Sequence, residues 1–313
     1  MINMLKMKKI FLALSAFALS LATLSAQDKP TMEEYNSRYE KLVARVGADG
    51  LGVETLLDHW IEDYPEDETP LVGKFSYYFT KSRSLSVEVM DVKKYLGENP
   101  TLTLKDSTGK DVNYFQVATY DDEIFGKATQ NLDKAISRKP ARLDLRFLKV
   151  AAYTQYEKES PDMAVNDLNA LIDYNFTQRP SWEYPGMEMN DEVFLALIQE
   201  YCYTFFTMGT PRSFKAFKEL SEKVLSYSPK NTLFMDNLGS YALVVDKDSK
   251  AALKMYNKVL KIDPRDYTAI KNCVLIARRD KNAKLEKKYL PMLVEVSEDE
   301  AEKASAEARL NAL

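Results

Sequence analysis

Apolar residues recur along the chain at helical spacing and at a fixed distance from proline. At three places a small or branched apolar residue is followed by leucine or tyrosine four positions later and by proline twelve positions later. A small residue lets a second helix approach, the larger residue one turn on fills the space beside it, and proline ends the helix because it lacks an N–H group. The pattern predicts the second helix of repeated helical pairs, at Val53-Leu57-Pro65, Ala128-Leu132-Pro140 and Ala252-Tyr256-Pro264.

Two further segments follow the same pattern less closely. One ends at Pro229 and has Phe217 and Ser221 at the two marked positions, and the other has Ala164 and Leu168 without a closing proline. Two of the intervals between copies, Ala128 to Ala164 and Pro229 to Pro264, are 36 and 35 residues, which is close to the period of about 34 found in helical-pair repeats. We therefore expect about five helical pairs.

The stretch 232–264 carries the most specific version of the pattern. It resembles the tetratricopeptide repeat, but it has Met235 and Ala242 where tryptophan and tyrosine are usual, and one extra residue in the turn at 246–250. The resemblance extends over residues 35–290 and implies an all-α solenoid of about five repeats. The residues that carry it are Met235, Leu238, Gly239, Ala242, Ala252, Tyr256 and Pro264.

The resemblance also implies a concave groove, lined by the first helix of each pair, that binds a peptide segment of another protein. The residues expected on these faces form a mixed set, unlike the lysine and asparagine clamp with which some family members hold a terminal carboxylate. We expect a non-enzymatic scaffold or adaptor whose partner is another envelope or secreted protein. The expected groove residues are Asp236, Ser240, Leu243, Lys271, Leu275 and Arg278.

A gap of 75 residues between Pro65 and Pro140 is longer than one repeat. Within it, the β-rich runs 101–104 and 112–117 flank a polar, glycine-containing loop at 106–111. This pattern predicts a small β-hairpin inserted inside a helical pair, within residues 82–120.

A second irregular segment, 175–190, contains Trp182, Tyr184, two prolines and a glycine, and is expected to be non-helical. Trp182 either packs inward between helical pairs or forms, with Tyr184, a stacking platform for a sugar or peptide. The second interpretation gives an alternative function, a carbohydrate-binding or carbohydrate-processing accessory protein. Glu183 and Glu188 could in principle form a glycosidase pair, although the sequence cannot supply their separation.

The two ends of the chain lie outside the repeats, which occupy 27–296. At the C-terminus, residues 297–313 begin with a capping box at 297–300 and continue with Ala301, Ala304 and Ala308, which predicts a helix that covers the end of the stack. At the N-terminus, three lysines precede an apolar run at 10–24, and a small residue follows at Ala26. Residues 1–26 therefore indicate a signal peptide cleaved near Ala26, and a protein that is periplasmic or secreted.

An uncleaved anchor is the alternative interpretation of this N-terminal segment. Its apolar run of 15 residues is shorter than the roughly 20 that span a bilayer, so we expect no stable membrane anchor. Cys202 and Cys273 both lie in apolar helical patterns and are expected to be buried, unpaired thiols despite export.

Composition removes several functional classes. The chain has 43 basic and 47 acidic residues and no lysine-rich stripe, so a nucleic-acid partner is not expected. His59 is the single histidine, and its apolar neighbours favour a packing role over catalysis. We expect no catalytic residues, no metal and no cofactor, and the sequence leaves the oligomeric state open.

Overall fold

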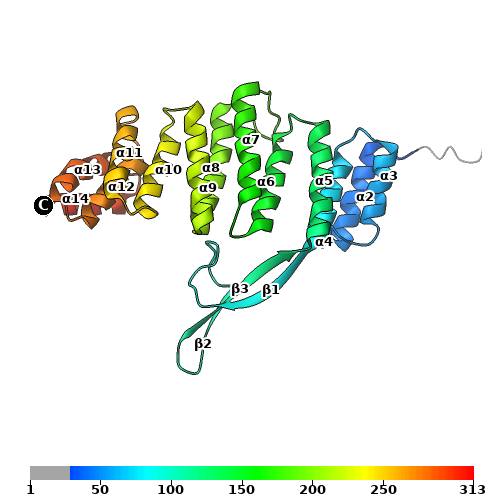
Figure 1. Ribbon diagram of the computed structural model, residues 1–313, viewed down its shortest axis with the longest axis horizontal. Coiled ribbons are helices and arrows are strands. Elements are labelled where there is room, and N and C mark those ends of the chain that lie inside the picture. Colours follow the sequence, from blue (N-terminus) through cyan, green and yellow to red (C-terminus); the bar gives the residue numbers. More distant parts are fainter. Residues whose placement is uncertain (1–28) are drawn as a thin grey trace, which may run out of the picture. The chain divides into compact units, whose positions relative to one another are not determined.

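The computed structural model describes residues 29–313 and is predominantly helical (Figure 1). This part of the chain contains thirteen helices and one three-stranded sheet, which confirms the expected all-α helical-repeat fold with a small β insertion. The predicted signal peptide, 1–26, lies outside the described residues. None of the helices between residues 29 and 313 has both the length and the apolar character needed to cross a bilayer.

The described chain forms two compact units. The first comprises residues 29–82 and 122–138, and the second comprises 83–121 and 139–313. The first unit contains α2 (Met32–Val46), α3 (Val53–Asp63), α4 (Thr69–Ser82) and α5 (Asp122–Arg138). The second contains β1 (Arg83–Met90), β2 (Leu102–Lys105), β3 (Asp111–Tyr120), α6 (Leu143–Glu157), α7 (Asp162–Gln178), α8 (Asp191–Met208), α9 (Pro211–Tyr227), α10 (Thr232–Val244), α11 (Ser249–Ile262), α12 (Tyr267–Arg279), α13 (Ala283–Val296) and α14 (Glu300–Asn311).

The residues at the two packing positions of each predicted second helix all lie in the interior. None of them exceeds 3% exposure, so the sequence spacing correctly identifies the helix faces that pack. Their burial removes apolar surface from water, which is the main force that holds neighbouring helices together. The set is Val53, Leu57, Ala128, Leu132, Ala164, Leu168, Phe217, Ser221, Ala252 and Tyr256.

Gly239 shows why the motif needs a glycine in the first helix of its pair. A Cβ atom built at this position would lie 2.6 Å from Cε1 of Tyr256, which is fully buried on α11. The two helices therefore meet at Gly239, as the repeat pattern implies, and the tyrosine ring occupies the space that a side chain would need.

The described helices form six consecutive pairs, one more than the five expected. The additional pair is α12 with α13, and α14 follows it. In α13, Glu286 stands where the other second helices carry a small or apolar residue, Pro291 lies inside the helix, and no proline closes it. The sequence pattern could not identify this helix because two of its three markers, the small residue and the closing proline, are absent.

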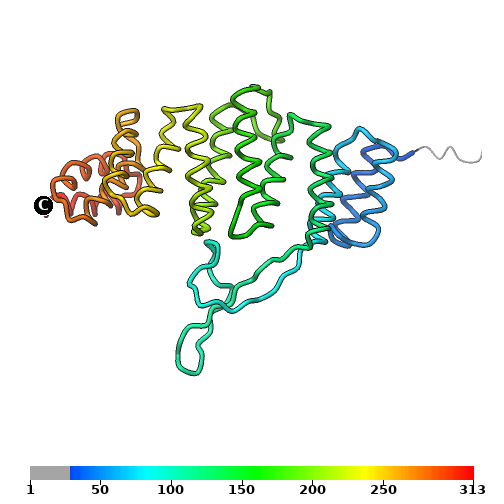
Figure 2. Tube along the Cα trace, viewed as in Figure 1, coloured from blue at the N-terminus to red at the C-terminus, as the bar shows by residue number. Residues whose placement is uncertain are grey.

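The inserted sheet has the strand order β1-β3-β2 and is antiparallel throughout. The hairpin of β2 and β3 lies where the sequence predicts it, and β1 is an additional strand that pairs with β3 from Arg83↔Tyr120 to Met90↔Asn113. In chain order, the three strands lie between α4 and α5. Within the second unit, the sheet runs beneath the ends of α6 and α8 (Figures 1 and 2).

Two expected boundaries are wrong. Helix α7 continues to Gln178, so residues 175–178 of the expected irregular segment are helical, and Arg179 ends the helix in a left-handed conformation. Helix α14 begins at Glu300, and Asp299 caps it by accepting from the N–H groups of Ala301 and Glu302, so the expected capping box at 297–300 does not form. Carboxylates are strong helix caps, and Asp299 is one residue from the helix start, whereas Ser297 is three.

The packed face of α14 also differs from the expected one. Ala301, Ala304 and Ala308 are exposed, and Ala306 is the buried residue of this helix. Helix α14 packs on α13, with Leu310 and Leu313 beside the same core cluster.

Both cysteines are free thiols and fully buried, as expected. Cys202 lies on α8 and Cys273 on α12, and burial raises the pKa of Cys202 to about 12 and that of Cys273 to about 11. Both thiols are therefore protonated at neutral pH, which suppresses thiol chemistry.

Candidate functional site

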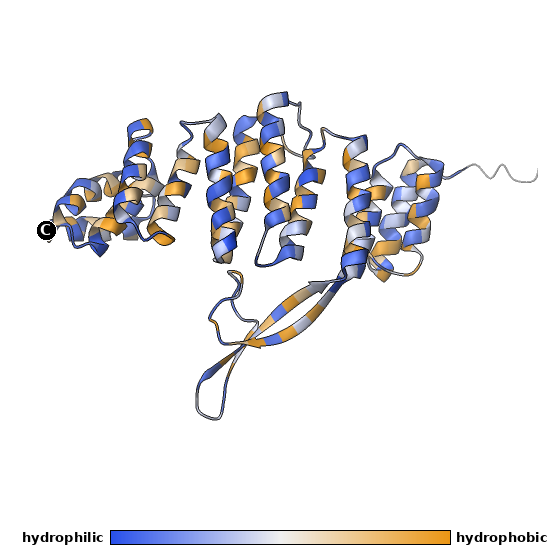
Figure 3. Ribbon diagram, viewed as in Figure 1, coloured by the Kyte–Doolittle hydropathy of each residue, from blue (hydrophilic) through white to orange (hydrophobic). Residues whose placement is uncertain are grey.

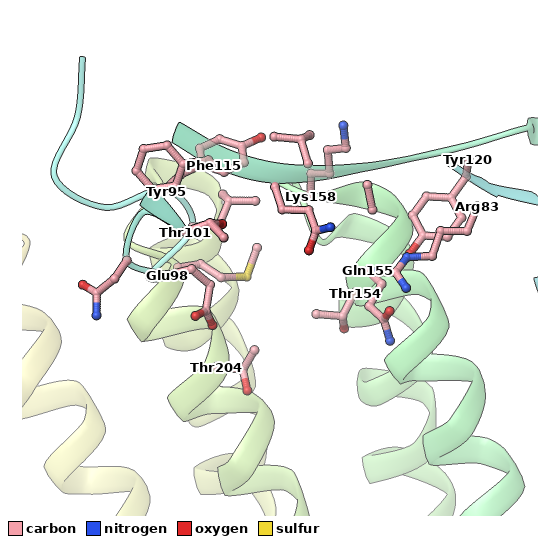
Figure 4. A pocket seen from close by; sticks show the side chains of 16 residues that line it. Arg83, Tyr95, Glu98, Thr101, Phe115, Tyr120, Thr154, Gln155, Lys158 and Thr204 are labelled. Carbon is pink, nitrogen blue, oxygen red and sulfur yellow. The ribbon is translucent and has the colours of Figure 1, made fainter. Parts of the chain in front are cut away.

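A cavity of about 490 Å³ lies between the sheet and the helices of the second unit (Figure 4). The sheet and the loop between β1 and β2 form one side of it. The C-terminal halves of α6 and α8 form the other side, with Thr154 and Gln155 on α6 and Thr204 and Met208 on α8. Its volume falls within the range of about 300–1,000 Å³ that is typical of ligand sites in proteins.

The loop between β1 and β2 is fixed to α8 by a tight turn. Tyr95 and Glu98 exchange backbone hydrogen bonds of 3.0 and 2.9 Å across Leu96 and Gly97, both of which have positive φ. A Cβ atom at Gly97 would lie 2.7 Å from the carbonyl oxygen of Thr207 on α8, so glycine allows the two backbones to touch. This contact holds the loop as a wall of the cavity.

Aromatic rings line the two ends of the cavity. At one end, Tyr95 packs edge-on against Phe115, with 6.1 Å between ring centroids, and Phe115 is 2% exposed. At the other end, Tyr120 packs edge-on against Tyr156 of α6 at 5.9 Å. Burial raises the pKa of both Tyr95 and Tyr120, so their phenols are neutral at physiological pH. Both residues line the cavity, and the hydroxyl oxygen of Tyr120 is buried.

Charged and polar side chains lie between these rings. Arg83 and Lys158 supply positive charge, Glu98 supplies negative charge, and Thr154 and Gln155 supply hydrogen-bonding groups (Figure 4). Such a lining can bind a molecule that has apolar side groups, amide groups and charges of both signs. Among residues 29–313, no group of three or more histidine, cysteine or carboxylate side chains is arranged to hold a metal ion.

Of the three residues expected to line a groove on α10, Asp236 is buried, and Ser240 and Leu243 are half-buried. Asp236 is 4% exposed, and its Oδ1 has no hydrogen-bond partner. Burial, together with Asp266 and Asp263, raises the pKa of Asp236 to about 8, so its carboxyl group is largely protonated at neutral pH. Ser240 shares a hydrogen bond of 3.1 Å with the hydroxyl of Tyr256, and Leu243 packs against the core.

The expected groove residues on α12 divide into two groups. Lys271 pairs with Glu302 of α14 at 3.0 Å and also donates to the hydroxyl of Tyr267 at 2.7 Å. Leu275 and Arg278 are exposed. Of the six expected groove residues, these two are exposed, and the C-terminal helix contacts the lysine beside them.

Trp182 and Tyr184 are both half-buried. The Trp182 ring stacks on Phe194 at 6.3 Å, and the guanidinium of Arg146 lies 5.5 Å from its centroid. Its Nε1–H donates to Oδ1 of the buried Asn175 at 2.8 Å. These contacts agree with the inward-packing interpretation of Trp182, and they leave less of the ring free for a ligand than a stacking platform requires.

The cavity residues were not predicted from the sequence. One signal was present, since Leu85, Val87 and Val89 alternate with Ser84, Ser86 and Glu88, which is the pattern of a strand. No local signal could have placed Tyr95 or Gly97 beside Thr207 of α8, which is 110 residues after Gly97.

Neither a protein-family model nor a curated protein matches the chain. The fold defines a helical-repeat protein, and the site that distinguishes it is the cavity beneath the inserted sheet.

Proposed function

We propose that this protein is a non-enzymatic scaffold or adaptor that binds a peptide segment of another protein in the cavity beneath the sheet. The observation that carries the proposal is the cavity itself, which has aromatic residues at its ends together with polar side chains and charges of both signs. The proposed site differs from the groove on α10 and α12 expected from the sequence, where Asp236 is buried and Lys271 is paired within the chain.

An extended peptide suits the chemistry of this cavity. Its apolar side chains would pack on Tyr95 and Tyr120, while Thr154 and Gln155 can exchange hydrogen bonds with its amide groups. Arg83 and Lys158 favour an acidic side chain in the segment, because two cations face the same space.

The family and the location of the protein belong to the same proposal. The burial of the residues at the repeat spacing and the close contact at Gly239 support a tetratricopeptide-type protein. The signal-peptide pattern at 1–26 supports export, and an exported adaptor would bind an envelope or secreted protein. The contacts of Trp182 count against the carbohydrate-binding alternative.

Selection of binding sequences from a displayed library of random peptides tests the proposal. Peptides that bind the purified protein should lose binding to the Thr204→Arg variant, because Thr204 is an exposed cavity residue and arginine would fill the space beside it. Gly97→Ala should also weaken binding, since it displaces the loop wall. Lys284→Glu on α13 changes an exposed residue outside the cavity and serves as the control. Binding that survives Thr204→Arg would place the peptide site elsewhere.

A further inference from the structure

Strand β1 forms an open edge of the inserted sheet. It pairs with β3 on one side, and in the described part of the chain no strand lies on its other side. Seven of its eight residues are exposed, and Met90 is half-buried. The outer backbone N–H and C=O groups of such a strand are free to pair with a further strand.

The same strand presents an exposed row of apolar side chains. Leu85, Val87 and Val89 are 51%, 67% and 62% exposed, and their alternate spacing places them on one side of β1. On β2, Leu102 and Leu104 are also about half exposed, and the apolar positions are visible along the strands in Figure 3. Clustered exposed apolar residues of this kind mark interaction surfaces in soluble proteins.

This edge lacks most of the features that usually prevent strand pairing, although it carries two charged residues, Arg83 and Glu88. Soluble proteins protect open edges with proline, lysine, bulges or very short strands. Residues 83–90 contain no proline and no lysine, and all eight pair with β3 in an unbroken register.

The sequence of β1 is complementary to itself in one antiparallel register. If Val87 lies on a two-fold axis, Leu85 faces Val89 of a second copy, and Val87 faces its own equivalent. In the same register Arg83 faces Asp91 of the second copy, so opposite charges meet at both ends of the paired strands. The Asp91 side chain is 83% exposed, and its contact with Lys110 is a surface ion pair that a second partner can join.

We propose that two copies of this chain associate through antiparallel pairing of their β1 strands, with Val87 at the two-fold axis. The pairing joins the two three-stranded sheets into one of six strands and continues the apolar row of Leu85, Val87 and Val89 across the axis. The interface is isologous, so it closes at a dimer. It shares Arg83 with the lining of the proposed peptide site, whereas Leu85, Val87 and Val89 do not line that cavity.

Cysteine crosslinking tests the register directly. Residues that face each other in an antiparallel pair have Cα atoms about 4.5–5.5 Å apart, which a disulfide can bridge. Val87→Cys should therefore form a covalent dimer under mild oxidation. In the same register, the two copies of residue 89 lie four residues apart along the strands, about 13 Å, so Val89→Cys is a matched control that should remain largely uncrosslinked. The native cysteines are buried and do not compete.

Charge exchange tests the end contacts in the otherwise unmodified protein. Sedimentation velocity should show a dimer for the wild type, and Arg83→Asp or Asp91→Arg should each weaken dimerisation by about tenfold, because like charges then face each other. The double exchange should restore most of the affinity. Lys110→Ala removes the contact of Asp91 within its own chain and should leave the dimer intact.

Three results would overturn the proposal. These are a monomeric wild type at about 100 μM, equal crosslinking of Val87→Cys and Val89→Cys, and a double charge exchange that fails to restore dimerisation. A monomer whose β1 amides become protected from hydrogen exchange by a peptide with alternating apolar residues would assign this edge to a different occupant.

Discussion

The C-terminal helices α10–α14 and the cavity beneath the sheet contain similar charged and polar residues. In the helices these side chains contact one another, and in the cavity they face an open space. In the C-terminal helices, polar residues that a repeat protein could offer to a ligand are used within the chain. Glu286 is 1% exposed and receives two hydrogen bonds from Arg309, at 2.7 and 2.9 Å, while Glu302 joins Lys271, Tyr267 and Ser297. In the cavity, Lys158 and Glu98 face an open space.

The difference follows from what packs against each surface. Helix α14 brings its own charges to α12 and α13, so the polar groups there are satisfied and the core beneath them is closed. The sheet contacts the helices through its ends and through the turn at Gly97, and a gap remains between these contacts. A regular helix stack thus leaves little free volume, whereas an inserted element of different shape creates a cavity.

Replacement of Trp182 by alanine should give the largest loss of stability. This variant tests whether the segment at 179–190 packs like the C-terminal helices or faces open space like the cavity. We expect a loss of about 3 kcal/mol in the free energy of unfolding, since the ring stacks on Phe194 and its N–H donates to Oδ1 of the buried Asn175. Urea denaturation measures the loss. Tyr203→Ala, at a ring that is 65% exposed, is the aromatic control and should cost much less. Equal losses for the two variants would mean that Trp182 is a surface residue.

Gly239→Leu should destabilise the packed region by about 1–3 kcal/mol, because even a Cβ atom clashes with the Tyr256 ring. The matched change on the cavity side, Thr204→Leu, should stay within about 0.5 kcal/mol of the wild type because the residue faces open space. Thermal unfolding of both variants provides the comparison. A melting temperature for Gly239→Leu at or above that of the wild type would show that the helices do not meet at this glycine.

Asp236→Asn should make stability less dependent on pH. The pKa of Asp236 is raised in the folded state, so its protonated form favours folding below the unfolded pKa of about 3.9, and this contribution is lost as the pH rises to about 8. Asparagine does not titrate, and its amide can still donate to Asp266, which caps α12 through the N–H of Ala269. The free energy of unfolding of the variant should therefore be closer to that of the wild type near pH 4 and exceed it by about 1–3 kcal/mol near pH 8.

Denaturation of Asp236→Asn and the wild type at several pH values measures this difference. Asp248→Asn, at an exposed helix cap on α11, is the control for loss of one carboxylate. A stability difference that does not change between pH 4 and 8 would mean that Asp236 remains ionised in the folded protein.

Lys271→Ala should give the smallest effect, a loss of about 0.5 kcal/mol that shrinks at high salt. Its ion pair with Glu302 is partly exposed, and Glu302 keeps its hydrogen bonds from Ser297 and Tyr267. Hydrogen exchange in α14 should be slightly faster in the variant. The control is Lys258→Ala, an exposed lysine on α11. A loss of several kcal/mol at Lys271 would show that α14 depends on this one contact.

Local patterns predicted most of the fold. The spacing from small residue to proline identified the second helices, because these markers act within one or two turns of the same helix. The hairpin of β2 and β3 was predictable because its turn is also local. Asp106 accepts hydrogen bonds from the N–H groups of Thr108 and Lys110, and Gly109 has a positive φ.

The candidate site was predicted poorly because exposure depends on neighbours that are distant in sequence. Asp236 has the position of a groove residue in its helix, but its environment is set by Asp266 and Asp263 thirty and twenty-seven residues later. Lys271 was expected to face a ligand, and Glu302 faces it instead.

The sequence by itself determined the helical pairs, their register, the buried free cysteines and the presence of a β insertion. These follow from periodicity, from proline and glycine, and from the burial of apolar faces, each of which is encoded within a few neighbouring residues. Only the tertiary structure decided where the open space lies, because the cavity exists where the backbone of Gly97 meets Thr207 and the strands pass the ends of α6 and α8. Such contacts join segments more than 30 residues apart, and no local preference of either segment specifies them.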